Sequence, residues 1–307
     1  MLDTITSINS AINNVVWGWP ALILLSFAGI LMTCLTKFLQ VTHIGHWMKE
    51  TISAIFRDKN VTGHTKDKSI SQFQSLCTAL AATVGTGNIV GVAGAIMVGG
   101  PGAVFWMWII AFFGMMTNYS ENVLGIYYRE KSPSGEWHGG AMYYLENGLG
   151  AKPGCKILGM VLAILFSIFC FLASFGIGNM TQVNSISGNM EAVFGVPTWL
   201  TGIVVLILAG LVILGGLKRI ASVTEKIVPF MVILYMIGTV VILILNFSMI
   251  GPVFSAIFRG AFAMKSAGGG IVGYGTKLAI EQGMKRGVFS NEAGLGSSVM
   301  VHSSSNV

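Results

Sequence analysis

TALAATVGTGNIVGVAGAI, residues 78–96, is a stretch of small and apolar residues that contains no charged side chain. Its length suits a membrane-spanning helix, which needs about 20 predominantly apolar residues. At its midpoint, however, stands the tetrapeptide GTGN, residues 85–88, and Gly91 and Gly94 follow. Each glycine destabilises a helix interior by about 1 kcal/mol relative to alanine. The stretch therefore predicts a membrane segment whose helix is interrupted halfway.

The composition of the whole chain points to a bilayer as its solvent. Of 307 residues, 53% are hydrophobic and only 10% are charged, with a mean hydropathy of +0.74. A soluble domain carries about 25% charged residues. Residues 1–16 lack a basic region, so no cleaved signal peptide is evident. We therefore expect an all-α polytopic membrane protein that forms a single transmembrane domain over 1–307.

Seven apolar segments can be marked along the chain. They cover 17–36, 73–98, 103–128, 156–184, 198–217, 226–247 and 253–282. With the exception of Arg259 and Lys265, every lysine and arginine lies in alternate connectors, namely 37–68, 129–156, 218–226 and the part after 276. Under the positive-inside rule these connectors are cytoplasmic and the N-terminus is outside. The charge of +6 thus has a topological role, and no nucleic-acid partner is expected.

Enzymatic and metal-binding motifs are not evident. The sequence contains no HExxH, GxSxG or P-loop lysine motif. The four cysteines form no CxxC pair, so buried free thiols are favoured over a metal site or a disulfide framework; they are Cys34, Cys77, Cys155 and Cys170. We expect neither an enzyme nor a bound cofactor.

The interruption at 85–88 has two interpretations. Gly87, Gly91 and Gly94 are spaced four and three residues apart, which is typical of close helix packing in membranes. Packing alone does not explain Thr83, Thr86 and Asn88. An unwound backbone is tolerated in a bilayer only where it lines a polar cavity. There, freed carbonyls can ligate a cation and the N-terminus of the second half-helix can hold a carboxylate.

A second interruption lies in the last apolar segment. Residues 261–274 read AFAMKSAGGGIVGY, and the three consecutive glycines 268–270 disfavour a continuous helix. A loop between two short segments is one interpretation. A broken span is the other, because about 15 residues precede the glycines and about 12 follow them, too few in each half to cross about 30 Å. Two glycine-interrupted spans indicate a transporter binding site.

Three further positions carry polar groups in or near the apolar segments. Gln182, with Asn179 on the same helical face, could simply bridge helices through hydrogen bonds. Glu121 is an intramembrane carboxylate, which is functional by default unless it lies solvated near a helix end. Glu292 follows Lys285 and Arg286 closely and could either pair with them or cap a helix.

Several separated motifs resemble the sodium:alanine/glycine symporters, a family of amino-acid carriers. They are VGTGN (84–88), GGPGAVFWMWIIAFFG (99–114), GGAMYYLENGLG (139–150), GNMTQVNSIS (178–187) and KRGVFSNEAGLGS (285–297). The resemblance implies a LeuT-type fold of two inverted five-helix repeats, here preceded by one extra helix. It also implies symport of small neutral amino acids, such as alanine and glycine, with Na⁺ as the co-transported ion.

Carried onto this sequence, the resemblance implies a role for each motif residue. The substrate carboxylate would be bound by Gly85, Thr86 and Gly87, and sodium by oxygens of Thr83, Val84 and Asn88. Gln182 would hold the polar groups of the amino acid, and Phe262 would cap its small side chain. The second break would face this site with Gly268, Gly269, Gly270 and Ile271, while Glu121 would join the two broken helices as a structural hub.

One departure from the family pattern is the number of helices. Relatives have about eleven, so seven segments correspond to the first repeat and part of the second, and the chain is expected to be a fragment. A sensor or binding subunit that does not transport, or an inactive truncated fragment, is therefore an alternative. A channel is less favoured, because one pair of breaks supplies no selectivity filter. The expected location is the cytoplasmic membrane of a prokaryote.

Overall fold

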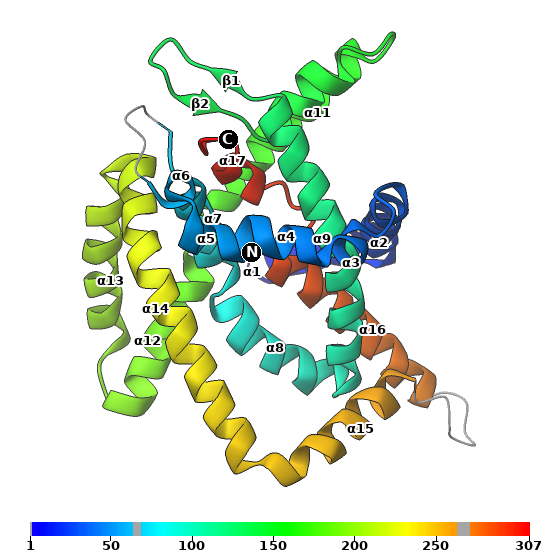
Figure 1. Ribbon diagram of the computed structural model, residues 1–307. Helices are drawn as coiled ribbons and strands as arrows, with labels where there is room; N and C mark the ends of the chain where they lie inside the picture. Colours follow the sequence, from blue (N-terminus) through cyan, green and yellow to red (C-terminus); the bar gives the residue numbers. More distant parts are fainter. Residues whose placement is uncertain (1, 64–68, 263–270) are drawn as a thin grey trace. The chain divides into compact units, whose positions relative to one another are not determined.

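The computed structural model describes residues 2–63, 69–262 and 271–307, and it is almost entirely helical (Figure 1). Within these residues, five apolar helical stretches, two of them made of two successive helices, are long enough to cross a bilayer: Thr6–Leu35, Gln72–Gly99, Gly102–Tyr127, Lys156–Ser174 and Gly216–Leu245. Two shorter apolar helices are Thr198–Ile213 and Phe247–Ala261. Large apolar side chains such as Leu24 and Phe27 are mostly exposed, as lipid-facing residues are. The prediction of an all-α membrane protein is confirmed.

The chain divides into two compact units, each built from three stretches of sequence. The first unit comprises 1–44, 91–120 and 242–295, and the second comprises 45–90, 121–241 and 296–307. Helices α8 (Thr86–Gly99), α9 (Gly102–Tyr127) and α14 (Gly216–Leu245) contribute residues to both.

Glycine contacts hold the helices of the first unit together. Besides most of α8 and α9, it contains α1 (Leu2–Val16), α2 (Trp19–Leu35), α3 (Leu39–Thr42), the short 3₁₀ helix η3 (Phe247–Met249), α15 (Ile250–Ala261) and α16 (Ile271–Asn291). α9 and α16 lie side by side (Figure 1), and Gly283 and Gly287 of α16 face α9 so closely that a β-carbon would collide with Ala103 or Ile110. Gly102 and Gly260 likewise bring the backbones of α9 and α15 together. Small residues thus permit the close approach on which membrane helix packing relies.

The second unit contains most of the remaining elements. Its helices are α4 (Ile44–Met48), the π-helix η1 (Lys49–Ser53), α5 (Ala54–Arg57), α6 (Lys59–Thr62), α7 (Gln72–Thr83), α10 (Ala141–Tyr143), the π-helix η2 (Tyr144–Leu149), α11 (Lys156–Ser174), α12 (Met180–Phe194), α13 (Thr198–Ile213), most of α14, and α17 (Ser298–His302). A two-stranded antiparallel hairpin pairs β1 (Glu130–Lys131) with β2 (Trp137–His138).

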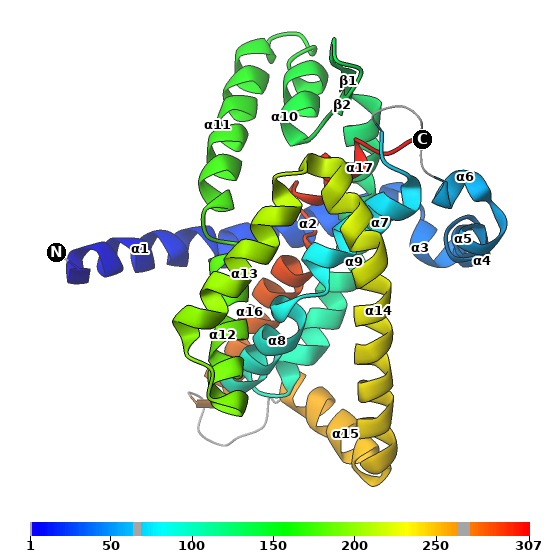
Figure 2. The ribbon, with the colours of Figure 1, turned by 90° about the vertical axis from the view of Figure 1, so that its left-hand side faces the viewer.

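Short sequence signals explain where two helices of the second unit begin or end. A capping box between Ser71 and Gln74 starts α7, and Gly195, with φ +67°, ends α12 before the turn into α13, which lies beside it (Figure 2).

Hydrogen bonds hold residues 302–307, which include the end of α17, against other parts of the second unit. The Arg129 guanidinium donates to the carbonyls of Ser303 at 3.1 Å, Ser305 at 2.7 Å and Val307 at 2.9 Å. Ser305 also forms a parallel bridge with Ile70, and His302 Nδ1 lies 2.9 Å from Ser75 Oγ of α7.

The boundaries of two predicted apolar segments differ from those of the helices in the structure. The segment 156–184 is not one helix, since α11 ends at Ser174 and α12 begins at Met180. Gly176 and Gly178 weaken the helix here, and the Asn179 side chain caps the new one by accepting a hydrogen bond from Met180 N–H at 2.6 Å. Consequently, most of the expected connector 185–197 is helical. The connector 218–226 is also helical, because α14 begins at Gly216 rather than near 226.

The four cysteines are free, as expected, but they are not uniformly buried. Cys77 is buried in α7, Cys155 and Cys170 are partly exposed, and Cys34 is exposed. The expectation of buried thiols is therefore wrong for Cys34, which lies near the end of a helix whose apolar surface faces outward.

Candidate functional site

The helix predicted to be interrupted is broken between α7 and α8. α7 ends at Thr83, and Val84 leaves the helical conformation with φ −86° and ψ 74°. The amide of Gly85 bonds to Thr83 O at 3.1 Å instead of continuing the helical ladder, and α8 begins at Thr86. The first N–H groups of any helix lack partners within the helix, so the start of α8 needs an acceptor from elsewhere.

Gln182 of α12 supplies that acceptor. Its Oε1 accepts from Thr86 N–H at 3.3 Å and from the Thr86 hydroxyl at 2.8 Å. The approach depends on the missing side chain of Gly85, because a β-carbon there would lie 2.9 Å from Gln182 Nε2. The structure thus brings together Gly85, Thr86 and Gln182, three of the residues expected to bind the substrate. Gly87, a fourth, is the second residue of α8.

The residues expected to bind sodium flank the same break, with Thr83 at the end of α7 and Asn88 in the first turn of α8. Asn88 Nδ2 donates a short hydrogen bond to Thr83 O, while the Thr83 hydroxyl donates to Ala79 O at 3.0 Å. Val84 is the residue between the two half-helices. Carbonyl, hydroxyl and carboxamide oxygens are therefore gathered within a few residues, which is the donor set that a hard cation prefers.

An apolar cavity of about 350 Å³ adjoins Thr86 within the second unit. Its walls come from α8, including Ile89 and Val90, and from α12, including Ile186 and Met190. It begins beside the hydrogen bonds between Thr86 and Gln182. The arrangement offers polar groups that can fix the head of a small ligand and an apolar space that can receive its side chain.

Glu121 lies close to the π-helix η2 in the second unit. Burial and then the nearby Glu121 carboxylate raise the pKa of Tyr144 to about 12, so that this phenol stays protonated. The electrostatic contact joins α9 to the helical segment 141–149. The expected role of Glu121 as a hub between the two broken helices stays a prediction.

The remaining predicted residues lie in the first unit or outside the described part. Phe262 follows the end of α15 and packs on Phe105, with ring centroids 4.8 Å apart, and on Trp106 at 6.0 Å. Gly268, Gly269 and Gly270 lie outside the described residues, and Ile271 is the first residue of α16. Most of the second predicted break therefore lies outside the described residues, and its presence stays a prediction.

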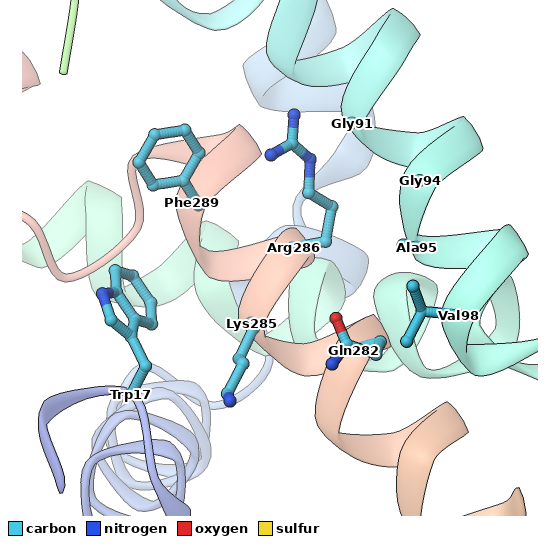
Figure 3. Close-up of a pocket in the computed structure, with 9 residues that line it drawn as sticks. All are labelled: Trp17, Gly91, Gly94, Ala95, Val98, Gln282, Lys285, Arg286 and Phe289. Atoms are coloured by element: carbon cyan, nitrogen blue, oxygen red, sulfur yellow. The ribbon is translucent and has the colours of Figure 1, made fainter. Parts of the chain in front are cut away.

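Two contacts in the first unit were not predicted from the sequence. Lys285 Nζ pairs at 2.6 Å with Glu281, one turn earlier on α16, rather than with the predicted Glu292. Glu292 has a left-handed φ of 50° and directly follows the end of α16. The Arg286 guanidinium lies against the backbone of Gly91 (Figure 3). Helical spacing could have indicated the first contact, but no local signal links positions 91 and 286.

Comparisons with known proteins identify the family of the chain. The chain matches the sodium:alanine symporter family over residues 2–307. It is 46% identical to an uncharacterized transporter of Haemophilus influenzae and 46% identical to the sodium/alanine symporter AgcS of Methanococcus maripaludis. Each alignment covers 96% of this chain and 61% or 62% of the relative, respectively. A third relative, 40% identical over 96% of this chain and 56% of its own length, is a putative sodium/proton-dependent alanine carrier protein of Bacillus subtilis.

The chain therefore spans about three fifths of the length of the curated relatives it matches. The family is one of transporters rather than enzymes. With its helix broken at Val84 and Gly85 and its match from residue 2 to residue 307, this chain belongs to the sodium:alanine symporter family.

Proposed function

We propose that this protein couples Na⁺ to the symport of small neutral amino acids, with alanine and glycine as substrates. The observation that carries the proposal is the pair of hydrogen bonds from Thr86 to Gln182 Oε1 at the break between α7 and α8. Two donors at the start of a half-helix, one from the backbone and one from a hydroxyl, suit a carboxylate.

In this proposal, Gln182 Oε1 occupies the position at Thr86 that the substrate carboxylate takes. This oxygen satisfies the start of α8, so the break costs little in the absence of substrate. An incoming carboxylate takes over the two hydrogen bonds of Thr86. Once displaced, the Gln182 carboxamide donates through Nε2 to that carboxylate or accepts from the ammonium group of the amino acid.

Sodium binds next to the amino acid at the same break in this proposal. Thr83, Val84 and Asn88 supply its oxygen ligands, and Asn88 already contacts the Thr83 carbonyl. The cation and the carboxylate then lie on one short stretch of backbone, where each favours the other electrostatically. The proposal includes a LeuT-type arrangement, in which α15 and α16 form the second broken helix, and location in the cytoplasmic membrane.

The test compares uptake and binding in one variant. Gln182→Ala should weaken alanine binding by about 1–3 kcal/mol, because it removes the carboxamide that hydrogen-bonds the polar groups of the amino acid in this proposal. Sodium-driven uptake of radiolabelled alanine into vesicles and calorimetric binding to the purified protein provide the two measurements. Gln72→Ala, remote from the break and bonded to Asn306 O, is a matched control. Alanine binding of wild-type strength in Gln182→Ala would contradict the proposed site.

The same pair of measurements separates transport from sensing. A sensor would bind alanine in a sodium-dependent manner but show no uptake into vesicles under a sodium gradient. Relatives also include a probable sodium/glutamine symporter of Bacillus subtilis, which is 37% identical. Glutamine is therefore included as a competitor, and the proposal expects alanine and glycine to compete more strongly than glutamine.

A further inference from the structure

A row of exposed apolar side chains runs along the helical segment 44–57, away from the proposed transport site. The segment consists of α4, η1 and α5, which follow one another without a gap and belong almost entirely to the second unit. Ile44, Met48, Ile52 and Phe56 stand four residues apart in it, and all four are exposed, Phe56 by 84%. Contiguous exposed apolar side chains mark a surface that contacts protein or membrane.

The π-helical turn η1 helps to align these side chains. On an α-helix, residues four apart drift by about 40° around the axis, because 3.6 residues complete one turn. The bonds from i to i+5 widen the turn in η1, so four residues fall short of a full turn there and the drift is partly cancelled. Ala54, two residues from Ile52 and from Phe56 and therefore on the other side of the helix, is buried. The row thus faces away from the rest of the second unit.

Basic side chains accompany the row along one edge. Lys49 and Arg57 each directly follow a residue of the row, so they lie at a similar angle beside it. Both are exposed, and neither forms an ion pair within the residues that the structure describes. Glu50, the one carboxylate in the sequence of residues 44–57, follows one position later and lies on the side away from the row. The edge is therefore positively charged.

The direction of the segment fits the surface of a bilayer. Within the second unit, Figures 1 and 2 show α4 and α5 lying across the direction of α14, nearer the N-terminal end of α14 than its C-terminal end. α14 is long and apolar enough to span a membrane. A helix that lies across a spanning helix runs along the plane of the membrane, which is the position that amphipathic interfacial helices take.

We propose that residues 44–57 form an interfacial helix that binds anionic phospholipid headgroups. The apolar row enters the boundary between headgroups and acyl chains, and Lys49 and Arg57 contact lipid phosphates beside it. Each cation near an anionic leaflet strengthens such binding about fivefold. A single row of four side chains supplies little of the roughly 800 Å² per partner that a stable protein interface needs. The surface is independent of the proposed transport function, because it shares no residue with the site at Thr86.

The experiment uses the whole chain in lipid nanodiscs, labelled with fluorotryptophan. Phe56→Trp adds one fluorine signal on the row, identified by comparison with the wild-type spectrum, and the exposure of this position makes the change compatible with folding. His46→Trp is the matched control, since His46 is exposed but lies two residues from Met48, on the other side of the helix. Fluorine NMR measures how strongly each signal is broadened by a nitroxide attached to phospholipid near its headgroup, and by a gadolinium chelate in the water.

In discs that combine phosphatidylcholine with phosphatidylglycerol, we expect the nitroxide to broaden the Phe56→Trp signal and the chelate to leave it sharp. The His46→Trp signal should respond in the opposite way. In discs of phosphatidylcholine alone, the Phe56→Trp signal should lose contact with lipid and become accessible to the chelate.

Removal of the two cations tests the charged edge. Lys49→Gln together with Arg57→Gln should weaken binding in the anionic discs about 30-fold, so that the Phe56→Trp signal behaves as it does in neutral discs. Lys152→Gln together with Lys156→Gln removes the same charge from two other exposed positions of the second unit and should not affect that signal.

Three results would overturn the proposal. Broadening of the Phe56→Trp signal by the chelate in anionic discs would show that the row lies in water. Protection from both agents would show that protein covers it, such as a second copy of this chain. Equal contact with lipid in neutral and anionic discs, with no effect of replacing Lys49 and Arg57, would show that anionic headgroups are not the partner.

Discussion

At the scale of single residues, Gly85 controls whether Gln182 can reach the start of α8. In Gly85→Ala the new β-carbon would lie 2.9 Å from Gln182 Nε2, closer than such atoms approach one another. The carboxamide must shift, which weakens its hydrogen bonds to Thr86. We expect alanine affinity to fall about tenfold, corresponding to about 1.4 kcal/mol, with little change in thermal stability. Calorimetry and thermal unfolding measure the two quantities.

Gly188→Ala is the matched control for this variant. Gly188 lies on α12, the helix that carries Gln182, but a β-carbon there meets no atom within 4 Å. It should bind alanine like the wild type. If both variants lose affinity equally, the effect comes from α12 as a whole, and the specific contact between Gly85 and Gln182 is not responsible.

Residue chemistry alone predicted only part of the site. The glycines at 85 and 87 and the polar residues around them indicated a break that could bind a cation and an anion, and the structure places the break at Val84 and Gly85. A role of Gln182 in substrate binding was expected only through family resemblance, because its residue chemistry alone also allowed a simple bridge between helices. Its hydrogen bonds to Thr86 were not predicted. The contact between Gly91 and Arg286 joins distant stretches of sequence, and no periodicity encodes it.

At the scale of elements, the packing of α17 on α7 should depend on pH. Burial lowers the pKa of His302 below its ordinary value, so the folded protein favours the neutral imidazole beside Ser75. The unfolded chain takes up a proton on this residue near pH 6.5, before the folded protein does. The free energy of unfolding should therefore decrease as the pH falls below about 6.5, and this decrease should level off below the folded pKa.

Thermal unfolding of the wild type and of His302→Gln between neutral and mildly acidic pH measures this contribution. Glutamine retains a hydrogen-bonding side chain but does not titrate in this range. As the pH falls, the free energy of unfolding of the wild type should decrease more than that of His302→Gln. A difference independent of pH would show that His302 has the same pKa in the folded and unfolded states.

Helix boundaries were predicted less well than the existence of helices. Hydropathy joined 156–184 into one segment, since residues 175–178 are apolar or small and contain no charge. The structure ends α11 before them, because two glycines disfavour the helix and Asn179 caps the next one. Conversely, a connector was predicted at 218–226 from its basic residues, Lys218, Arg219 and Lys226. Long basic side chains are compatible with a helix, and α14 already begins at Gly216.

At the scale of the whole molecule, the proposed function requires that sodium and amino acid affect each other's binding. Of the residues proposed for sodium, Thr83 ends α7, Val84 lies in the break and Asn88 lies on α8 after it, while Thr86 lies between them in sequence. Neither ligand can bind without fixing the same few backbone dihedral angles. Sodium should therefore increase alanine affinity, and by thermodynamic linkage alanine must increase sodium affinity by the same factor, for which about 5- to 150-fold is typical of coupled sites.

Four dissociation constants test this coupling: those of alanine without sodium and with saturating sodium, and those of sodium without alanine and with saturating alanine. We expect the two ratios to agree within error and to exceed about fivefold. Asn88→Ala removes the side chain that crosses the break to the Thr83 carbonyl, so it should lower both ratios together. Alanine binding that is insensitive to sodium would exclude a coupled site at this break. If sodium still increases alanine affinity in Asn88→Ala, the cation binds elsewhere than at Thr83 and Asn88, while the amino-acid site at Thr86 is not contradicted.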